Sequence, residues 1–311
     1  MIIQRRSNGI WTPPDLSGYP DANTTGPAAA GYTNLIYTTA QDFYSPSNMP
    51  PWAIAQQDGT WLVEGRLFDN PINVYVPNVT FRGCEWVYVN PDIFAVTAQP
   101  GADNLTMSYC SAHSSGPEDG DTYSHDHVRT IGLAGVYANG ATLDHNHVYW
   151  VVGGFLVAGT DLTMTDNYVH DTTYWTSDHN DCFQHSGGAV NSVIRHNRFE
   201  EGKWGVGRAQ TSAIALFQDF PADFVNVTVE DNLIAGGGYA MYCGYTASTP
   251  GSNVRIINNK FSTMFYPTGG FFGPKTREYP WDPVTGIDAN GNEWNGNIWA
   301  DGPNAGQVIP V

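Results

Sequence analysis

The chemically richest stretch of the sequence is residues 170–185, which combines carboxylate, amide, imidazole and aromatic side chains. Asp178 and Asp181 could act as general acid and general base on a glycosidic bond, with His179 or His185 tuning a neighbouring carboxylate. The same carboxylates could instead hold Ca²⁺ while a base removes the proton next to a uronate carboxylate, as in a lyase. The third interpretation is a polar loop that satisfies only its own backbone.

Further residues are expected near this stretch. Asp219 falls one repeat later and could complete a carboxylate cluster with Asp181. Aromatic rings could form a stacking platform for sugar rings, with loop packing as the alternative, and Arg195 could bind a uronate or form a plain salt bridge. The predicted catalytic set is therefore Asp178, Asp181, Asp219 and His179. The predicted substrate-binding set is Tyr174, Trp175, Gln184, Arg195, Trp204 and Tyr242.

Histidines elsewhere also suggest metal ligands. The segment 124–127 reads Ser-His-Asp-His, and His145 and His147 are spaced by two. Residues at that spacing share one face of a strand, but a predicted tight bend at Asn146 separates these two histidines. Transition-metal binding is therefore not favoured, and no metal is assigned from the sequence.

A repeat recurs between residues 78 and 261 and places these residues in space. Each copy reads apolar, polar, apolar, two polar, Asn, polar, apolar, which predicts a strand, a tight bend and another strand, with no helical period. Asn tolerates the left-handed conformation at such a bend, and its amide can bond to the same amide one coil away. The Asn position, occupied by Cys in the first two copies, falls at Cys84, Cys110, Asn146, Asn167, Asn197, Asn232 and Asn259.

The physical interpretation of the repeat is a parallel β-helix, because one copy cannot bury its apolar face until copies stack at the ~4.8 Å strand spacing. We predict an all-β, single-stranded, right-handed parallel β-helix over residues 33–300. Residues 1–32 form an N-terminal arm that Trp11 and Tyr19 hold to the body, and residues 301–311 form a tail. A coil and cap rich in Trp close the C-terminal end, since an open end would expose strand edges.

The four cysteines are expected to be buried and not to form a disulfide. Cys84 and Cys110 occupy the bend position, where a thiol acts as a small hydrophobic group. Cys182 and Cys243 fall in similar columns two coils apart, about 10 Å, which is too far for a disulfide.

The composition limits the partners. The formal net charge of −17 disfavours nucleic acid and anionic membrane surfaces. No apolar run approaches the ~20 residues of a membrane helix, so no membrane insertion is expected. No apolar signal segment follows Arg5 and Arg6. Three of the four Asn-X-Thr sequons, at Asn78, Asn104 and Asn226, belong to the repeat.

The repeat resembles that of the pectate-lyase-like superfamily. Four motifs resemble more narrowly a family of right-handed β-helix proteins of actinobacteria and their phages: 18–26 (GYPDANTTG), 178–184 (DHNDxxQ), 212–220 (SAIxxxQDF) and 232–239 (NxxxGGGY). The resemblance covers roughly residues 18–300. Bacterial members usually carry an export signal, so its absence favours a phage virion protein of the minor-tail or tailspike type. The Asp-Asp, Gly-His-Gly and Arg-x-Lys motifs of polygalacturonases are absent.

Three functions are therefore open. The first is a tail-associated virion protein, or an extracellular one, that binds a host surface polysaccharide. The second is a polysaccharide lyase or glycoside hydrolase centred on Asp178 and Asp181, with Ca²⁺ as the candidate cofactor. The third is a purely structural virion component. The resemblance to phage β-helices also implies a homotrimer and an N-terminal arm that attaches to other virion proteins.

Overall fold

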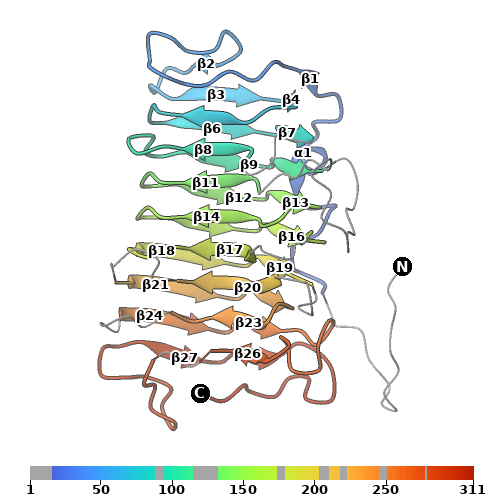
Figure 1. Cartoon of the computed structure of the whole chain (residues 1–311), viewed down its shortest axis with the longest axis vertical. Coiled ribbons are helices and arrows are strands. Elements are labelled where there is room, and N and C mark those ends of the chain that lie inside the picture. The colour runs from blue at the N-terminus through green and yellow to red at the C-terminus, as the bar shows by residue number, and fades with distance from the viewer. Residues whose placement is uncertain are drawn as a thin grey trace.

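The computed structural model describes residues 16–87, 94–114, 132–173, 179–202, 210–217, 223–244, 251–276 and 279–311. Within these ranges the chain has one short helix, α1 (Gly26–Ala29), and three long sheets of ten, eight and ten strands. The sheets run the length of the molecule (Figure 1). Among the described residues, the strand pairs of these sheets are parallel except β2 with β3, which lie at the N-terminal end. The all-β prediction with parallel strands is confirmed.

Sheet 1 contains, in spatial order, β1 (Ile36–Tyr37), β4 (Arg66–Phe68), β7 (Glu85–Val87), β10 (Ser111–His113), β13 (His147–Tyr149), β16 (Tyr168–His170), β19 (Arg198–Glu200), β22 (Leu233–Ala235), β25 (Lys260–Phe261) and β28 (Ile298–Trp299). Sheet 2 contains β5 (Ile72–Val74), β8 (Val96–Ala98), β11 (Ala134–Val136), β14 (Phe155–Val157), β17 (Asn180–His185), β20 (Gln210–Leu216), β23 (Tyr239–Tyr242) and β26 (Gly273–Lys275). Sheet 3 contains β2 (Ile54–Ala55), β3 (Trp61–Glu64), β6 (Val79–Arg82), β9 (Thr106–Ser108), β12 (Thr142–Asp144), β15 (Thr163–Thr165), β18 (Val190–Arg195), β21 (Val225–Glu230), β24 (Ser252–Ile257) and β27 (Glu293–Asn295).

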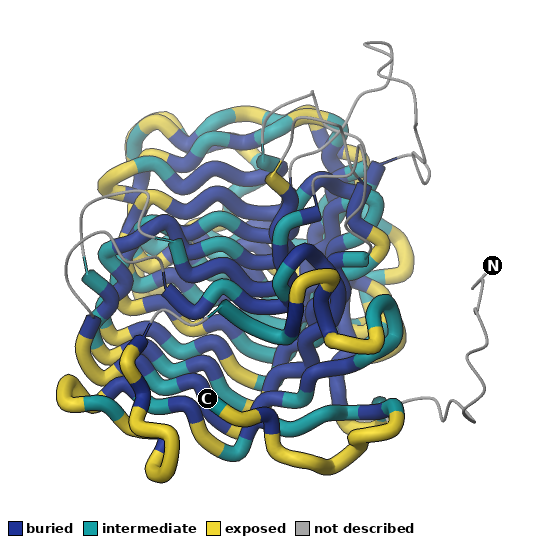
Figure 2. Tube along the Cα trace, turned by 60° about the horizontal axis from the view of Figure 1, so that its bottom comes forward, coloured by how far each residue is buried: buried dark blue, intermediate teal, exposed yellow. Residues whose placement is uncertain are grey.

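Each coil of the chain adds one strand to each sheet, as β3, β4 and β5 do before β6 returns to pair with β3. This topology fits a parallel β-helix. The side chains that point inward form columns across the coils, and Figure 2 shows the buried residues recurring coil after coil. Each buried large apolar side chain contributes roughly 1.5–3 kcal/mol. The inward column of sheet 3 consists of Val63, Phe81, Met107, Leu143, Met164, Ile194, Val229, Ile256 and Trp294.

The predicted Asn column lies at the two-residue turn between sheet 3 and sheet 1, and it is a continuous buried ladder. Asn197 is typical: its Oδ1 accepts bonds from the backbone N and Nδ2 of Asn167, at 2.9 and 2.8 Å. Its Nδ2 donates to Oδ1 of Asn232 at 3.0 Å and to Met164 O at 3.1 Å. Each amide therefore satisfies backbone groups that the turn would otherwise leave buried and unpaired.

The two cysteines at the start of the column also contact backbone groups, but a thiol forms weaker hydrogen bonds than an amide. The Sγ of Cys110 contacts Phe81 O and Ser108 O at 3.5 Å, while its backbone N donates to Oδ1 of Asn146 at 2.9 Å. All four cysteines are buried and free, as predicted. Cys243 follows β23 in line with His185 rather than with Cys182.

The column continues one coil beyond the repeat found in the sequence. Asn297 accepts bonds from the backbone N and Nδ2 of Asn259 at 2.9 and 3.0 Å, and β27 and β28 flank it. The tail then folds back, because Trp294 Nε1 donates to Ile309 O at 2.9 Å. The segment predicted as a terminal coil and cap thus contains β26, β27 and β28, one in each sheet. The signal of this last copy was weak because polar Asn292 stands where the repeat has an apolar residue and apolar Ile298 where it has a polar one.

A second, exposed ladder lies at the turn that enters sheet 3. Its residues have left-handed backbone angles, with φ of 53° at Asn191 and 54° at Asn226. Asn226 donates to Asn191 at 3.1 Å, and Asn253 donates to Asn226 at 2.9 Å. Gly140 takes this place in one coil, where a Cβ would lie 2.4 Å from Oδ1 of Asn104. The sequons at Asn78, Asn104 and Asn226 are therefore turn residues of the repeat.

Residues 16–32 of the arm cross the coils along the two-residue turns. Tyr19 is buried, stacks on His196 with 5.4 Å between ring centroids, and donates to Oδ1 of Asp231 at 3.1 Å. Further along, the Gly26 N donates to His145 O at 2.8 Å. Tyr19 thus contacts the coils as expected from the sequence, whereas Trp11 lies outside the described residues. None of the described helices is long and apolar enough to span a membrane.

Candidate functional site

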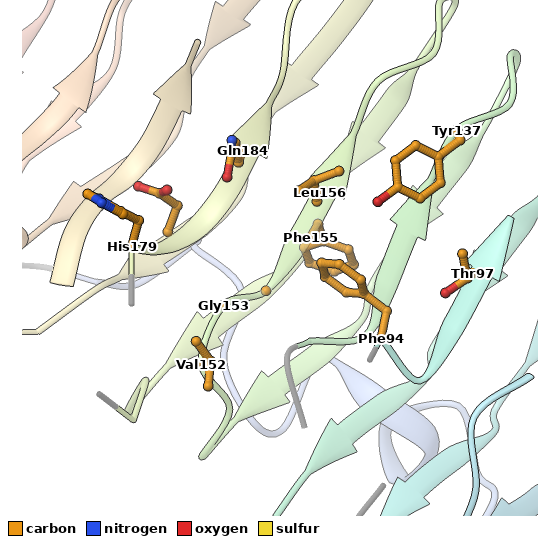
Figure 3. Close-up of a pocket in the computed structure, with 11 residues that line it drawn as sticks. Phe94, Thr97, Tyr137, Val152, Gly153, Phe155, Leu156, His179 and Gln184 are labelled. Atoms are coloured by element: carbon orange, nitrogen blue, oxygen red, sulfur yellow. The ribbon is translucent and has the colours of Figure 1, made fainter. Parts of the chain in front are cut away.

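A cleft of about 390 Å³ opens on sheet 2 beside the loops that arrive from sheet 1 (Figure 3). It crosses four coils, from β8 through β11 and β14 to β17. One part of its wall is aromatic and apolar, and the other part carries polar groups, so it could bind an amphipathic ligand. The lining residues are Phe94, Thr97, Tyr137, Val152, Gly153, Gly154, Phe155, Leu156, His179, Asp181 and Gln184.

The strand register explains why residues distant in sequence meet in this cleft. Four residues lie opposite one another on successive strands of sheet 2: Thr97, Gly135, Leu156 and Gln184. A glycine is needed at position 135 because a Cβ there would lie 2.7 Å from the ring of Phe94. The absence of a side chain at Gly135 thus lets the ring of Phe94 lie close to the sheet.

Asp181 belongs to this cleft but is largely shielded from solvent. It is the second residue of β17 and is 5% exposed. The hydroxyl of Ser212, on the next strand, donates to its Oδ1. His179 beside it is exposed, and its Nδ1 lies 3.4 Å from Oγ1 of Thr211. Asp181 is therefore a fixed hydrogen-bond acceptor at one end of the cleft.

Behind Asp181 lies a buried polar group centred on Glu201, which is fully buried. Thr172 Oγ1 donates to Glu201 Oε1 at 3.0 Å, and the Cys182 thiol donates to Oε2 at 3.2 Å. Burial, together with the charge of Asp181, raises the pKa of Glu201 well above its usual value. Glu201 therefore keeps its proton to higher pH than an ordinary glutamate, and it lies beside a second carboxyl group.

The structure brings part of the predicted site together. His179, Asp181 and Gln184 line the cleft. Gln184 pairs with Ala215 on the next strand, and Ala215 pairs with Tyr242 on the strand after that. Tyr242 is half-buried. The remaining predicted residues of this region lie outside the described residues: Asp178, Asp219, Tyr174, Trp175 and Trp204.

The strand assignments place two of the predicted residues. Arg195 ends β18 in sheet 3, opposite Thr165 and Glu230, and is not among the residues that line the cleft on sheet 2. Asp181 lies within β17, next to an irregularity in the pairing at Asn180. Sequence order alone does not show where a strand begins or which sheet it joins.

Several residues of the site were not found from the sequence. Phe94 and Tyr137 supply the accessible aromatic rings, and Glu201 supplies the buried acid. The apolar column that contains residues 155–157 and 182–185 was recognised, so aligning the strands on that column would have indicated Leu156 opposite Gln184. The burial of Glu201 has no signal in the sequence.

Comparisons with known proteins leave the chain without an assigned family. No family model, no curated protein and no solved structure matches it.

Proposed function

We propose that this chain is a right-handed β-helix of the pectate-lyase-like type that binds a polysaccharide in the cleft on sheet 2. The observation that carries the proposal is the composition of the cleft, which combines aromatic rings from Phe94 and Tyr137 with polar groups from His179 and Gln184. Sugars present apolar ring faces and hydroxyl edges, which suits this combination. The stacked coils hold these side chains on a rigid support, so little ordering is needed on binding.

The setting proposed for this activity is a phage tail, where the protein recognises a surface polysaccharide of the host. The motifs shared with β-helix proteins of actinobacteria and their phages support this setting. Residues 16–32 pack against their own chain, so attachment to other virion proteins would fall to residues 1–15. A homotrimer belongs to the same proposal.

Cleavage of the polysaccharide is the second candidate function. It is favoured by one observation: Asp181 at the cleft lies beside Glu201, whose pKa is raised by burial. In most glycosidases two carboxyl groups flank the glycosidic bond. Asp181 would supply one of them, whereas Glu201, which does not line the cleft, would act only through Asp181.

Binding is tested with purified protein and a panel of surface polysaccharides from candidate host cells, using affinity electrophoresis. Tyr137→Ala should weaken binding about tenfold, equivalent to ~1.4 kcal/mol. Tyr75→Ala is the matched control, because Tyr75 follows β5 as Tyr137 follows β11, is 43% exposed against 40%, and does not line the cleft. Equal effects of the two variants, or no binding by the wild type, would contradict the proposal.

Turnover is tested on any polysaccharide that binds. New reducing ends would indicate a hydrolase, and new ultraviolet absorbance from unsaturated uronates would indicate a lyase. Either product should disappear with Asp181→Asn while Asn retains the shape of the side chain. Binding without product leaves a recognition protein, and product that persists in Asp181→Asn excludes this residue from catalysis.

A further inference from the structure

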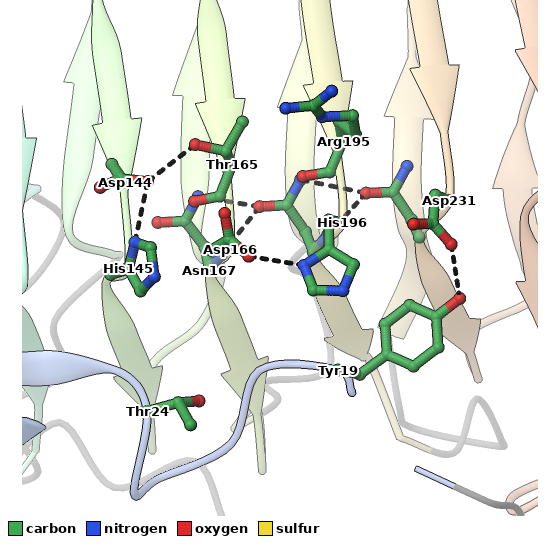
Figure 4. Close-up of polar contacts among 12 residues, drawn as sticks. Tyr19, Thr24, Asp144, His145, Thr165, Asp166, Asn167, Arg195, His196 and Asp231 are labelled. Carbon is green, nitrogen blue, oxygen red and sulfur yellow. Dashed lines mark hydrogen bonds and ion pairs between the residues drawn. The ribbon is translucent and has the colours of Figure 1, made fainter. Parts of the chain in front are cut away.

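A second group of ionisable side chains lies on a different edge of the molecule, where strands of sheet 3 end in the two-residue turns (Figure 4). Asp144 is the last residue of β12, His145 opens the turn that follows, and Asp166 opens the same turn in the next coil. One ligand atom from each of these residues lies within 4.8 Å of the other two. All three side chains are partly exposed, so a small ion can reach them from solvent.

The three side chains are held in place by neighbouring coils. Thr165 Oγ1 donates to Asp144 Oδ1 at 2.7 Å. His196 Nδ1 lies 2.5 Å from Asp166 Oδ1, and the ring of Tyr109 stacks on His145 with 4.7 Å between centroids. Groups that bind metals are usually oriented in this way by a surrounding layer of hydrogen bonds. The cluster is therefore arranged before any ion arrives.

An independent observation concerns the Nδ1 atom of His145. This atom is shielded from solvent and has no hydrogen-bond partner among the described residues. It nevertheless lies 2.9 Å from Asp144 Oδ1, in a contact that does not have hydrogen-bond geometry. Two donor atoms about 3 Å apart can both lie ~2.1 Å from one metal ion when the angle between them is about 90°, as in an octahedral site. An ion between them would satisfy both atoms.

We propose that Asp144, His145 and Asp166 bind a divalent first-row transition cation such as Zn²⁺ or Mn²⁺. One imidazole nitrogen and two carboxylate oxygens suit these ions, whereas Ca²⁺ and Mg²⁺ prefer oxygen alone. The left-handed turn conformation, with φ of 53° at His145 and 57° at Asp166, brings the ligands from two coils to one place. The ion would join those coils beneath the arm, whose Gly26 N donates to His145 O.

A nearby histidine pair is the rival location for such an ion. Nε2 of His147 lies 2.8 Å from Nε2 of His170, and Asp171 lies 2.8 Å from the other ring nitrogen of His170. This pair provides only two nitrogen donors, and one neutral ring can donate a hydrogen bond to the other. It is therefore explained without a metal, and a variant at His170 distinguishes the two locations.

The test titrates chelator-stripped full-length protein with ZnCl₂, MnCl₂ and CaCl₂ by isothermal calorimetry. We expect one Zn²⁺ or Mn²⁺ per chain at this site, bound more tightly than Ca²⁺. His145→Asn and Asp166→Asn should each weaken that binding at least tenfold, because each removes a ligand charge or a ligand nitrogen. Asn favours the left-handed turn, so both variants should keep the fold, which their melting temperature without metal checks.

Asp161→Asn is the matched control. Asp161 is also an acidic turn residue with a left-handed backbone, φ of 58°, but it lies at the turn that enters sheet 3. It should bind the metal as the wild type does, and so should His170→Gln. The proposal is overturned if the wild type binds neither Zn²⁺ nor Mn²⁺, if Ca²⁺ binds more tightly, or if binding is lost only in His170→Gln.

Discussion

Two buried titratable residues couple the stability of this protein to pH in opposite directions. Glu201 has a raised pKa because it is buried near Asp181. Burial lowers the pKa of His185 to about 4. The native state therefore disfavours ionised Glu201 at high pH and protonated His185 at low pH. At the scale of residues, each of these side chains lowers the stability of the native state because an ionisable group is buried inside the coils.

Glu201→Gln should stabilise the protein at neutral pH. The unfolded chain releases the Glu201 proton above about pH 4.3, whereas the native state keeps it, so stability from this residue falls as pH rises. The amide removes that penalty and can keep an oxygen toward Thr172. Urea unfolding at pH 4 and pH 8 should show a smaller loss of stability with rising pH in the variant. A variant less stable than the wild type at pH 8 would contradict the raised pKa of Glu201.

His185→Gln should remove a loss of stability in acid. Between about pH 6.5 and 4 the unfolded chain binds a proton that native His185 does not, so stability falls as pH decreases through this window, by on the order of 3 kcal/mol. Gln can still donate to Gly159 O, which His185 Nε2 contacts at 3.2 Å. Thermal unfolding between pH 4 and 7 measures the effect. An unchanged slope would show that other groups cause the acid sensitivity.

At the scale of elements, the two-residue turn depends on the buried Asn ladder. Each amide bonds to backbone groups that have no partner within the turn, and it links its coil to both neighbouring coils. The exposed ladder at the other turn repeats the pattern in contact with water. Burial therefore decides how much each ladder contributes, because only buried unpaired groups incur the full desolvation cost.

Asn197→Ala should destabilise the protein by about 3 kcal/mol or more, since it leaves the backbone N of Asn167 and nearby carbonyls buried without partners. Asn226→Gly is the comparison in the exposed ladder. Glycine accepts the left-handed angle of Asn226, so its cost should stay below about 1 kcal/mol. Denaturant unfolding of both variants measures the difference. Equal costs would show that the ladders stabilise through something other than buried hydrogen bonds.

At the scale of the whole molecule, residues 16–32 form a strap across the coils. The strap contacts the coil of Lys260, whose Nζ lies 5.0 Å from the ring centroid of Tyr19, and it reaches Gly83 through Tyr32. A Cβ at Gly83 would lie 2.1 Å from the Tyr32 ring, so glycine is required there. The strap therefore ties together coils that are far apart along the stack.

Tyr19→Ala should loosen the strap while the coils stay folded. The variant loses the stacking on His196 and the hydrogen bond to Asp231, together about 2 kcal/mol. Hydrogen exchange should become faster at residues 19–26 and remain slow along the Asn ladder. Tyr37→Ala is the control, since Tyr37 is 62% exposed and its hydroxyl bonds to Asp69 outside the strap. Faster exchange throughout the coils would contradict an independent strap.

The periodic part of this protein was predictable from its sequence. The spacing of apolar residues and the Asn at each bend follow from local stereochemistry repeated in every coil, and they indicated the parallel strands, the buried ladder from Asn146 to Asn259 and the free cysteines. The last rung at Asn297 was missed because its copy departs from the repeat, with polar Asn292 at an apolar position and apolar Ile298 at a polar one. Local pattern could not place Arg195 or Asp181, because neither sheet membership nor strand ends are set by neighbouring residues alone.

The sequence by itself determined the repeating coil, since each copy carries its own turn residue and inward apolar positions. Only the tertiary structure decided which side chains meet. Parallel stacking brings Phe94 and Gln184 into one cleft, buries Glu201 beside Asp181, and gathers Asp144, His145 and Asp166 on another edge. The physical reason is that insertions of unequal length lie between coils, so the register of the strands, not separation along the chain, sets these neighbours.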